Sequence, residues 1–319
     1  MSNIRDLARA LGVSIGTVSR ALNGKPDVNA ETRARILAAA AAKGYTANPA
    51  ARSLRKGSTN IVAFLFAPPA PDDPARDFAF LDIVEGVQAE FEAAGLELVV
   101  LPCPASQSPA DYVRRLLGRR FFDAMILMGG DRAVRLELGA AGVPVIALEG
   151  EGPAATVALD CRFAFSEAVG LLRTLGHDRI GFAPGHCECG RTYGPEVVTL
   201  TPSHGEADGR ALGVELLSLP EVPTALIVDN DAVAAGVYAA LRTAGRVPGR
   251  DLSVVSLRAV DDLKIAVPGL ARFRYDTAQL GAALARTCLG VLAGQPADGT
   301  LSLAIAPGFE PGDSVAAPV

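Results

Sequence analysis

Residues 3–23 constrain the fold most, because they read as two short helices joined by a tight turn. The apolar residues at positions 4, 7, 8 and 11 recur at helical spacing, which predicts one buried stripe on the first helix. Gly12 can end that helix in the left-handed region, and Ser14 can cap the next helix. A helix-turn-helix of this kind presents the first residues of its second helix to base edges in the major groove of DNA.

The second helix is expected to turn one face inward and another toward DNA. The inward residues are Val18, Ala21 and Leu22, and the outward residues near its start are Ile15, Gly16, Thr17 and Arg20. Because Gly16 offers no side chain to a base, we expect Arg20 to carry most of the direct readout, bidentate on a guanine. The polar side chains around it are expected to contact phosphates instead. These are Ser14, Thr17, Ser19 and Asn23, and for Ser19 a hydroxyl that only faces water is the alternative.

Two further segments complete a small DNA-binding head. Residues 30–43 predict a third helix that turns Ile36, Leu37 and Ala40 inward and stops at Gly44. Residues 48–55 predict a short hinge helix, with Asn48 as its cap and a proline at its first position. A helix of about two turns is marginal alone in water, so we expect it to form only with DNA and a second copy of the chain.

The charge of the chain is divided unevenly. Residues 1–58 hold ten Lys and Arg against three acids, which gives a formal charge of +7. The whole chain has 30 basic and 35 acidic residues, so residues 59–319 hold 20 against 32 and carry −12. A basic head on an acidic body directs a polyanion such as DNA to one end of the protein.

Beyond residue 58 the sequence alternates between short apolar strands and amphipathic helices. A first series of strands is predicted at 61–66, 96–101, 124–128 and 143–148, with helices at 80–94 and 109–119. A second series is predicted at 157–159, 179–183, 197–200, 225–228, 252–256 and 271–273, with helices at 163–175, 209–219, 231–243 and 277–292. This alternation indicates parallel sheets covered by helices on both faces, in two doubly wound α/β lobes. Ligands of such folds bind beyond the carboxyl ends of the strands, here in the cleft between the lobes.

Composition and motifs exclude several other classes of protein. No apolar run approaches the roughly 20 residues that span a bilayer, and the chain starts directly with a helix, so we expect neither a membrane segment nor a secretory signal. Five scattered cysteines argue against a disulfide framework, which favours a cytoplasmic protein. Because the sequence has no Walker A motif, nucleophile elbow or His-Glu-x-x-His motif, we expect no enzyme activity and no cofactor.

The sequence resembles the lactose/galactose repressor (LacI/GalR) family of bacterial transcription regulators. The matching residues of the head are 4–8, 12–14, 17–20, 22–23, 44–45 and 48–54, and those of the body are 175–182, 229–236 and 252–256. The resemblance implies an all-α helix-turn-helix headpiece (1–46), a hinge helix and linker (47–58), and a two-lobed periplasmic-binding-protein-like domain for effector binding and dimerisation (59–319). Its N-lobe is expected at about 59–157 plus 276–305, and its C-lobe at about 158–275 plus 306–312.

The same resemblance implies how the chain meets DNA. Ile15, Gly16 and Arg20 sit where the family reads major-groove bases, and Leu54 sits where two subunits wedge a leucine into the minor groove. The hinge residues Asn48 and Arg52 join this set. A wedge of this kind kinks the duplex and lets it contact more protein. We therefore expect a homodimeric repressor on a near-palindromic operator, with an effector that favours or opposes pairing of the hinge helices.

The resemblance also implies a set of effector-binding residues. In the cleft it places Phe80, Asp160, Asn230, Asp231 and Arg258. Ordinary structural roles compete with this interpretation: Phe80 as helix core, and Asp160 and Asp231 as caps of the helices that follow them. His177 is expected to cap a helix end and to carry no chemistry.

Two departures from the family pattern bear on the ligand. The family usually has an acidic residue where this chain has Arg258, and an arginine suits a carboxylate or a phosphate. The connection 184–196 is too short for the helix that carries a ligand-binding arginine in relatives, and Arg191 is a candidate to replace it. The effector is expected among sugars, sugar acids, phosphates and nucleosides, and an acidic small molecule is favoured. A cleft with a differently built mouth and a regulator that has lost its ligand response are the alternatives.

Residues 186–189 read His-Cys-Glu-Cys, which leaves a metal- or redox-responsive variant open. The Cys-x-Cys spacing is not the usual zinc knuckle, so we assign no metal site.

Overall fold

The computed structural model describes residues 4–22, 24–43, 58–66, 75–104, 106–119, 121–128, 132–148, 154–185, 197–259, 267, 269–297 and 301–318. The chain divides into two compact units, Met1–Asn60 and Ile61–Val319. Within the described ranges, no helix has both the length and the apolar character needed to cross a membrane.

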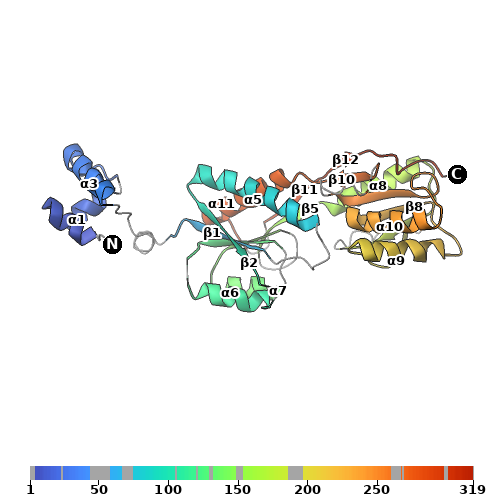
Figure 1. Ribbon diagram of the computed structural model, residues 1–319, viewed down its shortest axis with the longest axis horizontal. Helices are drawn as coiled ribbons and strands as arrows, with labels where there is room; N and C mark the ends of the chain where they lie inside the picture. The colour runs from blue at the N-terminus through green and yellow to red at the C-terminus, as the bar shows by residue number, and fades with distance from the viewer. Residues whose placement is uncertain are drawn as a thin grey trace. The chain divides into compact units, whose positions relative to one another are not determined.

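The first unit contains a three-helix headpiece, formed by α1 (Ile4–Leu11), α2 (Ile15–Leu22) and α3 (Ala30–Ala42) (Figure 1). Its core holds Leu7, Val18 and Ile36, each at most 1% exposed. Gly12 has a φ of +67°, the left-handed conformation that ends α1 as predicted. The described part of the head therefore has the helix-turn-helix arrangement that its apolar spacing predicts.

Leu37 differs from this prediction. It is 47% exposed, whereas Ile36 and Ala40 are buried. Ile36 and Ala40 are four residues apart and share one helix face, while Leu37 is turned about 100° away from Ile36. Val28, in the turn before α3, fills the core instead.

The first lobe of the second unit is built on a six-stranded sheet in the order β11-β5-β4-β3-β1-β2, in which every pairing is parallel. Its strands are β1 (Ile61–Phe66), β2 (Glu97–Pro102), β3 (Ala124–Met128), β4 (Val145–Leu148), β5 (Ala155–Leu159) and β11 (Ser302–Ile305), and its helices are α5 (Ala75–Ala94), α6 (Pro109–Leu117), α7 (Arg132–Ala140) and α11 (Thr277–Leu292). Alternate residues of β1 enter opposite cores. Val62 and Phe64 pack with α5 and α11, whereas Ala63 and Leu65 pack with α6 and α7. Figure 1 shows these two helix pairs on opposite faces of the sheet, so the lobe is doubly wound as predicted.

The second lobe repeats this plan, with the strand order β12-β10-β9-β8-β6-β7. Its strands are β6 (Ile180–Ala183), β7 (Val197–Thr199), β8 (Ala225–Asn230), β9 (Ser253–Ala259), β10 (Ala271–Arg274) and β12 (Gly308–Glu310), and its helices are α8 (Cys161–Thr174), α9 (Glu206–Leu217) and α10 (Asp231–Thr243). Ile227 of β8 packs in the core on the α8 side, and Leu226 packs in the core on the α9 and α10 side. Among the described strands of this sheet, β12 alone departs from the parallel pattern, since it pairs antiparallel with β10.

The chain passes between the two sheets three times: from β5 to α8, from β10 to α11, and from β11 to β12. The expected place of residues 157–159 in the second series is wrong, because β5 is hydrogen-bonded to β4 and β11 in the first sheet. Its partner β11 comes from the far end of the chain, so no local pattern reveals that pairing. The sequence pattern also leaves out α7, β11 and β12, and it starts α5 at Phe80 rather than at Ala75.

His177 fastens the C-terminal segment to the second lobe. Its backbone N–H donates to the carbonyl of Leu172 at 3.0 Å and closes the end of α8, which agrees with the expected helix-end role. Its buried ring lies 2.8 Å from Thr224 Oγ1 through Nδ1 and 2.8 Å from the carbonyl oxygen of Ala316 through Nε2. The residue therefore links a helix end, a strand start and the C-terminal segment.

Helices α9 and α10 approach each other so closely that glycine is needed between them (Figure 1). A β-carbon on Gly209 would lie 2.1 Å from the carbonyl oxygen of Val233. We expect Gly209→Ala to lower the free energy of unfolding by about 1–3 kcal/mol, because the two helices must separate. Urea denaturation followed by circular dichroism measures the change.

Gly170→Ala is the matched control for this substitution. Gly170 lies in the exposed middle of α8 in the same lobe, and its added β-carbon would meet nothing within 4 Å. Gly170→Ala should raise the free energy of unfolding by up to about 1 kcal/mol, because alanine has a higher helix propensity than glycine. Similar effects of the two alanines would show that close packing of α9 and α10 is not what requires Gly209.

Candidate functional site

The start of α2 forms an exposed surface on the headpiece. Ile15 is 46% exposed, Gly16 and Arg20 are exposed, and Thr17 and Ser19 are half-buried. The hydroxyl of Ser14 accepts a hydrogen bond from the backbone N–H of Thr17 at 3.0 Å, so Ser14 caps α2 as predicted. The Ser14 and Thr17 hydroxyls also form a hydrogen bond with each other, with their oxygens 2.8 Å apart.

Arg20 has an acidic neighbour on this surface. Its Nε lies 3.6 Å from Oδ2 of Asp27, and both side chains are about half exposed. A β-carbon placed on Gly16 would lie 3.7 Å from Nη2 of Arg20, so the guanidinium lies close to the glycine. Gly16 therefore adds no side chain beside the guanidinium, which comes from the last turn of α2. The other predicted DNA contacts, Asn23, Asn48, Arg52 and Leu54, lie outside the described residues.

A second candidate site lies at the carboxyl ends of β8 and β9. Asn230 and Arg258 are register partners on these neighbouring strands, as expected for residues of one site. Arg258, whose side chain is 17% exposed, has its Nε 4.0 Å from Oδ2 of Asp229. Asp229 is only 1% exposed, and a β-carbon on Gly185 would lie 2.4 Å from its carboxylate. The Arg258 guanidinium therefore forms an ion pair with the buried carboxylate of Asp229.

The side chain of Asn230 has a structural role, because both of its polar atoms form hydrogen bonds within the protein. Its Oδ1 accepts from the backbone N–H of Val233 at 3.0 Å, which makes it the N-cap of α10. Its Nδ2 donates to the carbonyl of His204 at 3.1 Å and lies 3.4 Å from Oδ2 of Asp229. These bonds fix the loop that contains His204 against the edge of the sheet.

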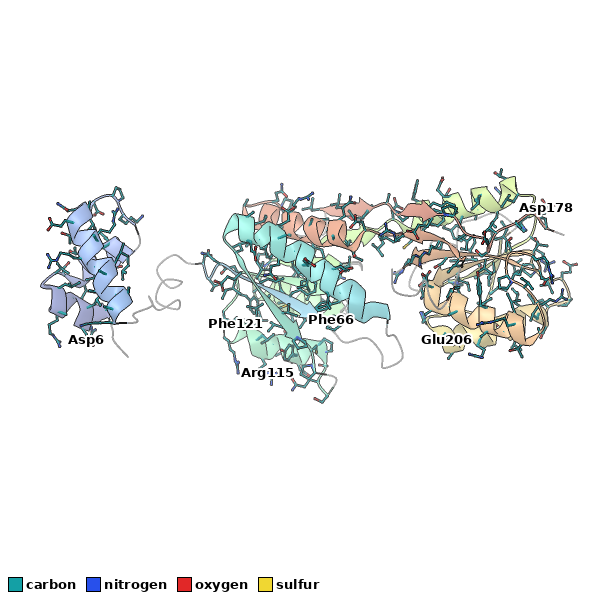
Figure 2. The ribbon with its side chains drawn as sticks, turned by 45° about the horizontal axis from the view of Figure 1, so that its top comes forward. Asp6, Phe66, Arg115, Phe121, Asp178 and Glu206 are labelled. Carbon is teal, nitrogen blue, oxygen red and sulfur yellow. The ribbon has the colours of Figure 1, made fainter. Side chains whose placement is uncertain are left out.

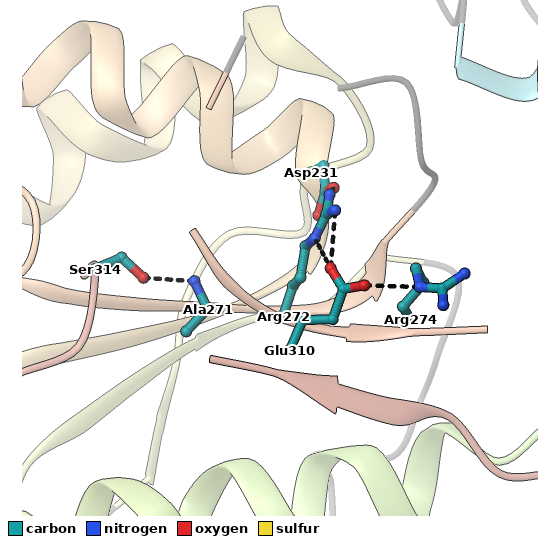
Figure 3. Close-up of polar contacts among 6 residues, drawn as sticks. All are labelled: Asp231, Ala271, Arg272, Arg274, Glu310 and Ser314. Atoms are coloured by element: carbon teal, nitrogen blue, oxygen red, sulfur yellow. Dashed lines mark hydrogen bonds and ion pairs between the residues drawn. The ribbon is translucent and has the colours of Figure 1, made fainter. Parts of the chain in front are cut away.

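Asp231 belongs to a chain of alternating charges (Figure 3). Its Oδ2 lies 3.0 Å from Nη1 of Arg272, and the side chains are 1% and 4% exposed. Arg272 Nη2 lies 2.9 Å from Oε2 of Glu310, whose Oε1 accepts from Nε of Arg274 at 2.8 Å. Burial raises the pKa of the Asp231 carboxyl, while Arg272 opposes that rise. Since Asn230 is the cap of α10 and Asp231 is buried against Arg272, the alternative of Asp231 as a cap is wrong, and its side chain exposes almost no surface to a ligand.

Two of the remaining predicted effector residues, Phe80 and Asp160, have structural roles on other elements. Phe80, on α5 of the first lobe, stacks on Phe66 with ring centroids 4.3 Å apart and packs against the core (Figure 2 labels Phe66). Asp160 caps α8 by accepting from the backbone N–H of Phe163 at 2.9 Å. Arg191 lies outside the described residues, as do Cys187 and Cys189. Among the residues that the structure does describe, no group of three His, Cys, Asp or Glu could hold a metal ion.

Sequence reasoning did not single out Asp229 or Arg272 for the second site. Asp229 directly precedes Asn230 at the end of a buried strand, and that position was the available signal. Arg272 lies 41 residues from Asp231 in an apolar strand pattern, so no local feature predicts their pairing.

Comparisons with known proteins bear on the family and the fold of the chain. Residues 3–48 match the family described as bacterial regulatory proteins, lacI family, and residues 187–315 match a periplasmic binding protein-like domain. The HTH-type transcriptional regulator RafR of Escherichia coli is 31% identical over 283 residues, which cover 82% of each chain. The regulator AglR of Rhizobium meliloti is 29% identical over 329 residues, which cover 92% of this chain and 88% of AglR.

Solved structures agree on the fold. The lac repressor dimer bound to operator and the anti-inducer ONPF superimposes with a TM-score of 0.81 at 23% identity, covering 99% of each chain. At that identity the likeness concerns the fold, namely a helix-turn-helix headpiece joined to a two-lobed α/β domain.

The buried ion pair of the second site generates a stability prediction. Arg272→Met should lower the free energy of unfolding by about 3–5 kcal/mol, because Asp231 would remain buried without its cation. Arg274→Met is the matched control, since it removes an exposed arginine from the same Glu310 and should cost less than about 1 kcal/mol. Urea denaturation followed by circular dichroism compares the two. Equal losses would mean that burial of the Asp231–Arg272 pair is not decisive.

Proposed function

The chain belongs to the LacI family of bacterial regulatory proteins and is a DNA-binding transcriptional regulator, and we propose that it represses transcription as a homodimer on a near-palindromic operator. The observation that carries this proposal is the exposed face of α2, with Arg20 accessible, in a DNA-binding head (residues 1–58) whose sequence has a charge of +7. Base edges are read from that position of a helix-turn-helix, and the positive charge attracts phosphates.

A homodimer is supported by the geometry of recognition. A single headpiece reads one half-site, and twofold protein symmetry matches an operator with twofold symmetry. The hinge segment 48–55, too short to be stable alone, would gain a partner in the dimer. The lac repressor, which shares this fold, forms a dimer on its operator. We propose that the headpieces act in the compartment that holds the chromosome, the cytoplasm.

We propose a small polyhydroxylated effector, a sugar or a sugar acid, at the carboxyl edge of the second sheet. Arg258 can donate hydrogen bonds to such a ligand, and Asp229 beneath it partly offsets the positive charge. Because the Asp229 carboxylate offsets the positive charge of Arg258, the described residues of this edge favour a purely anionic ligand less than the sequence did. A regulator without ligand response and a metal- or redox-responsive variant remain the alternatives that the ligand experiment below distinguishes.

Selection of bound duplexes from a random pool tests the DNA-binding proposal directly and yields the operator. With that operator in hand, Arg20→Ala should reduce discrimination between operator and random DNA by about 1–3 kcal/mol, because a bidentate base contact is lost. Binding measured at one fixed salt concentration compares the two affinities. An equal loss on both DNAs would assign Arg20 to phosphates and contradict its reading role.

Thermal-shift measurements with sugars, sugar acids, sugar phosphates and nucleosides test the effector proposal. A true effector should raise the melting temperature of the wild type, and Arg258→Ala should weaken that shift because its donors are gone. Arg274→Ala, at the same sheet edge but paired with Glu310, is the control that should keep the shift. Stabilisation by a ligand that Arg258→Ala leaves unchanged would place the effector elsewhere, and stabilisation by zinc alone would favour the metal-responsive alternative.

A further inference from the structure

We infer that Asp27 is a positioning residue for base readout: its carboxylate attracts the Nε edge of Arg20 as an ion pair and leaves the two Nη groups for a guanine. The inference rests on the proposed function, because it concerns the operator-bound headpiece. A guanidinium has five N–H donors in a planar fork, and a bidentate base contact uses two of them. A carboxylate beside Nε favours one orientation of the guanidinium plane and does not compete for the base contact through Nη1 and Nη2.

The carboxylate of Asp27 lies on the correct side of Arg20. Oδ2 is 3.6 Å from Nε, and Nη2 lies on the Gly16 side of the guanidinium. Asp27 therefore faces the edge of the group that a base contact through Nη1 and Nη2 would leave unused. Gly16, which has no side chain, brings no competing polar atom to the other edge.

The turn that contains Asp27 is anchored at both ends. At its start, the backbone N–H of Lys25 donates to the carbonyl of Arg20 at 3.0 Å. At its end, Val28 is buried in the headpiece core, and its N–H donates to the carbonyl of Lys25 at 3.4 Å. The Arg33 guanidinium also donates to that carbonyl. Asp27 is thus a carboxylate on a fixed turn, which suits a positioning role better than a side chain on a loose loop.

The charge of Asp27 acts differently on operator and on other DNA. In any complex, a carboxylate close to the duplex repels phosphates and lowers affinity. In the operator complex, Arg20 lies between Asp27 and a guanine, and exclusion of water strengthens the attraction between the two charges. Asp27 therefore penalises nonspecific complexes more than the operator complex, which is one way to increase specificity.

The test compares Asp27→Ala and Asp27→Asn with wild type on the selected operator, on its single-base variants and on random duplex. Asp27→Ala should lower the operator-to-random affinity ratio roughly threefold to tenfold, with Asp27→Asn in between because its amide oxygen keeps a partial negative charge beside Nε. The Asp27 variants should lose base preference at the same operator position as Arg20→Ala. If Asp27 only stabilised the headpiece fold, its loss would not change the preference at that single position.

Asp6→Asn is the matched control, since Asp6 is another headpiece acid, with its Oδ1 3.8 Å from Nη1 of Arg9 (Figure 2 labels Asp6). Loss of that charge should raise operator and random affinity by the same factor and leave the ratio unchanged. In the Arg20→Ala background, Asp27→Ala should produce no further loss of preference at that base. Circular dichroism melts confirm that each headpiece is folded.

The inference would be overturned if the Asp27 variants left the operator-to-random ratio unchanged, as Asp6→Asn should. It would also be overturned if Asp27→Ala reduced base preference further in the Arg20→Ala background. Either result would leave the proposed function standing. If the wild type selects no operator at all, the proposed function itself fails. The two failures are therefore distinguishable.

Discussion

The inner strands of both sheets, such as β1, β3, β8 and β9, are buried on both faces, and the rest of the architecture depends on this constraint. Val62 and Phe64 of β1 enter one core while Ala63 and Leu65 enter the other, and each large apolar side chain stabilises the fold by about 1.5–3 kcal/mol when it leaves water. Helices must cover both faces, so polar side chains gather where the strands end. The carboxyl edge of the second sheet is where Asp229, Asn230 and Arg258 meet.

The charges at that edge are largely neutralised by one another. Asp231, Arg272, Glu310 and Arg274 alternate in sign, and Asp229 accompanies Arg258 (Figure 3). A ligand at the edge would therefore meet oriented donors and acceptors rather than a strong field of one sign. The chain of charges also lies beside two of the passages between the sheets, because β10 leads to α11 and β12 follows β11. A ligand that disturbed these pairs would act on the same segments that join the lobes.

The sequence predicts the elements whose signal is local. The i, i+4 spacing of Ile36 and Ala40, the caps Ser14 and Asp160, and the bounds of α10 and α11 all follow from neighbouring residues. The failures involve distant partners. β5 joins the first sheet because β11 returns to it from the far end of the chain, and Asp231 is recruited by Arg272 rather than capping its helix. The strands β11 and β12 are short and largely exposed, so no apolar run marks them. The part of the candidate DNA surface that the structure describes depends on residues 14–20 alone, whereas the ligand site combines residues that are distant in the sequence.

The headpiece shows why positive charge alone cannot produce specificity. The charge of +7 on residues 1–58 attracts every duplex equally, since phosphates carry no sequence information. Discrimination needs a donor group that is held in one orientation, and long arginine side chains lose conformational freedom when they are held. On this surface the fixed turn between α2 and α3 places an acid beside Arg20, while Gly16 leaves the other side of the guanidinium open. A negative charge in a basic headpiece thus acquires a function: it lowers general affinity for DNA and keeps one cation ready for a base.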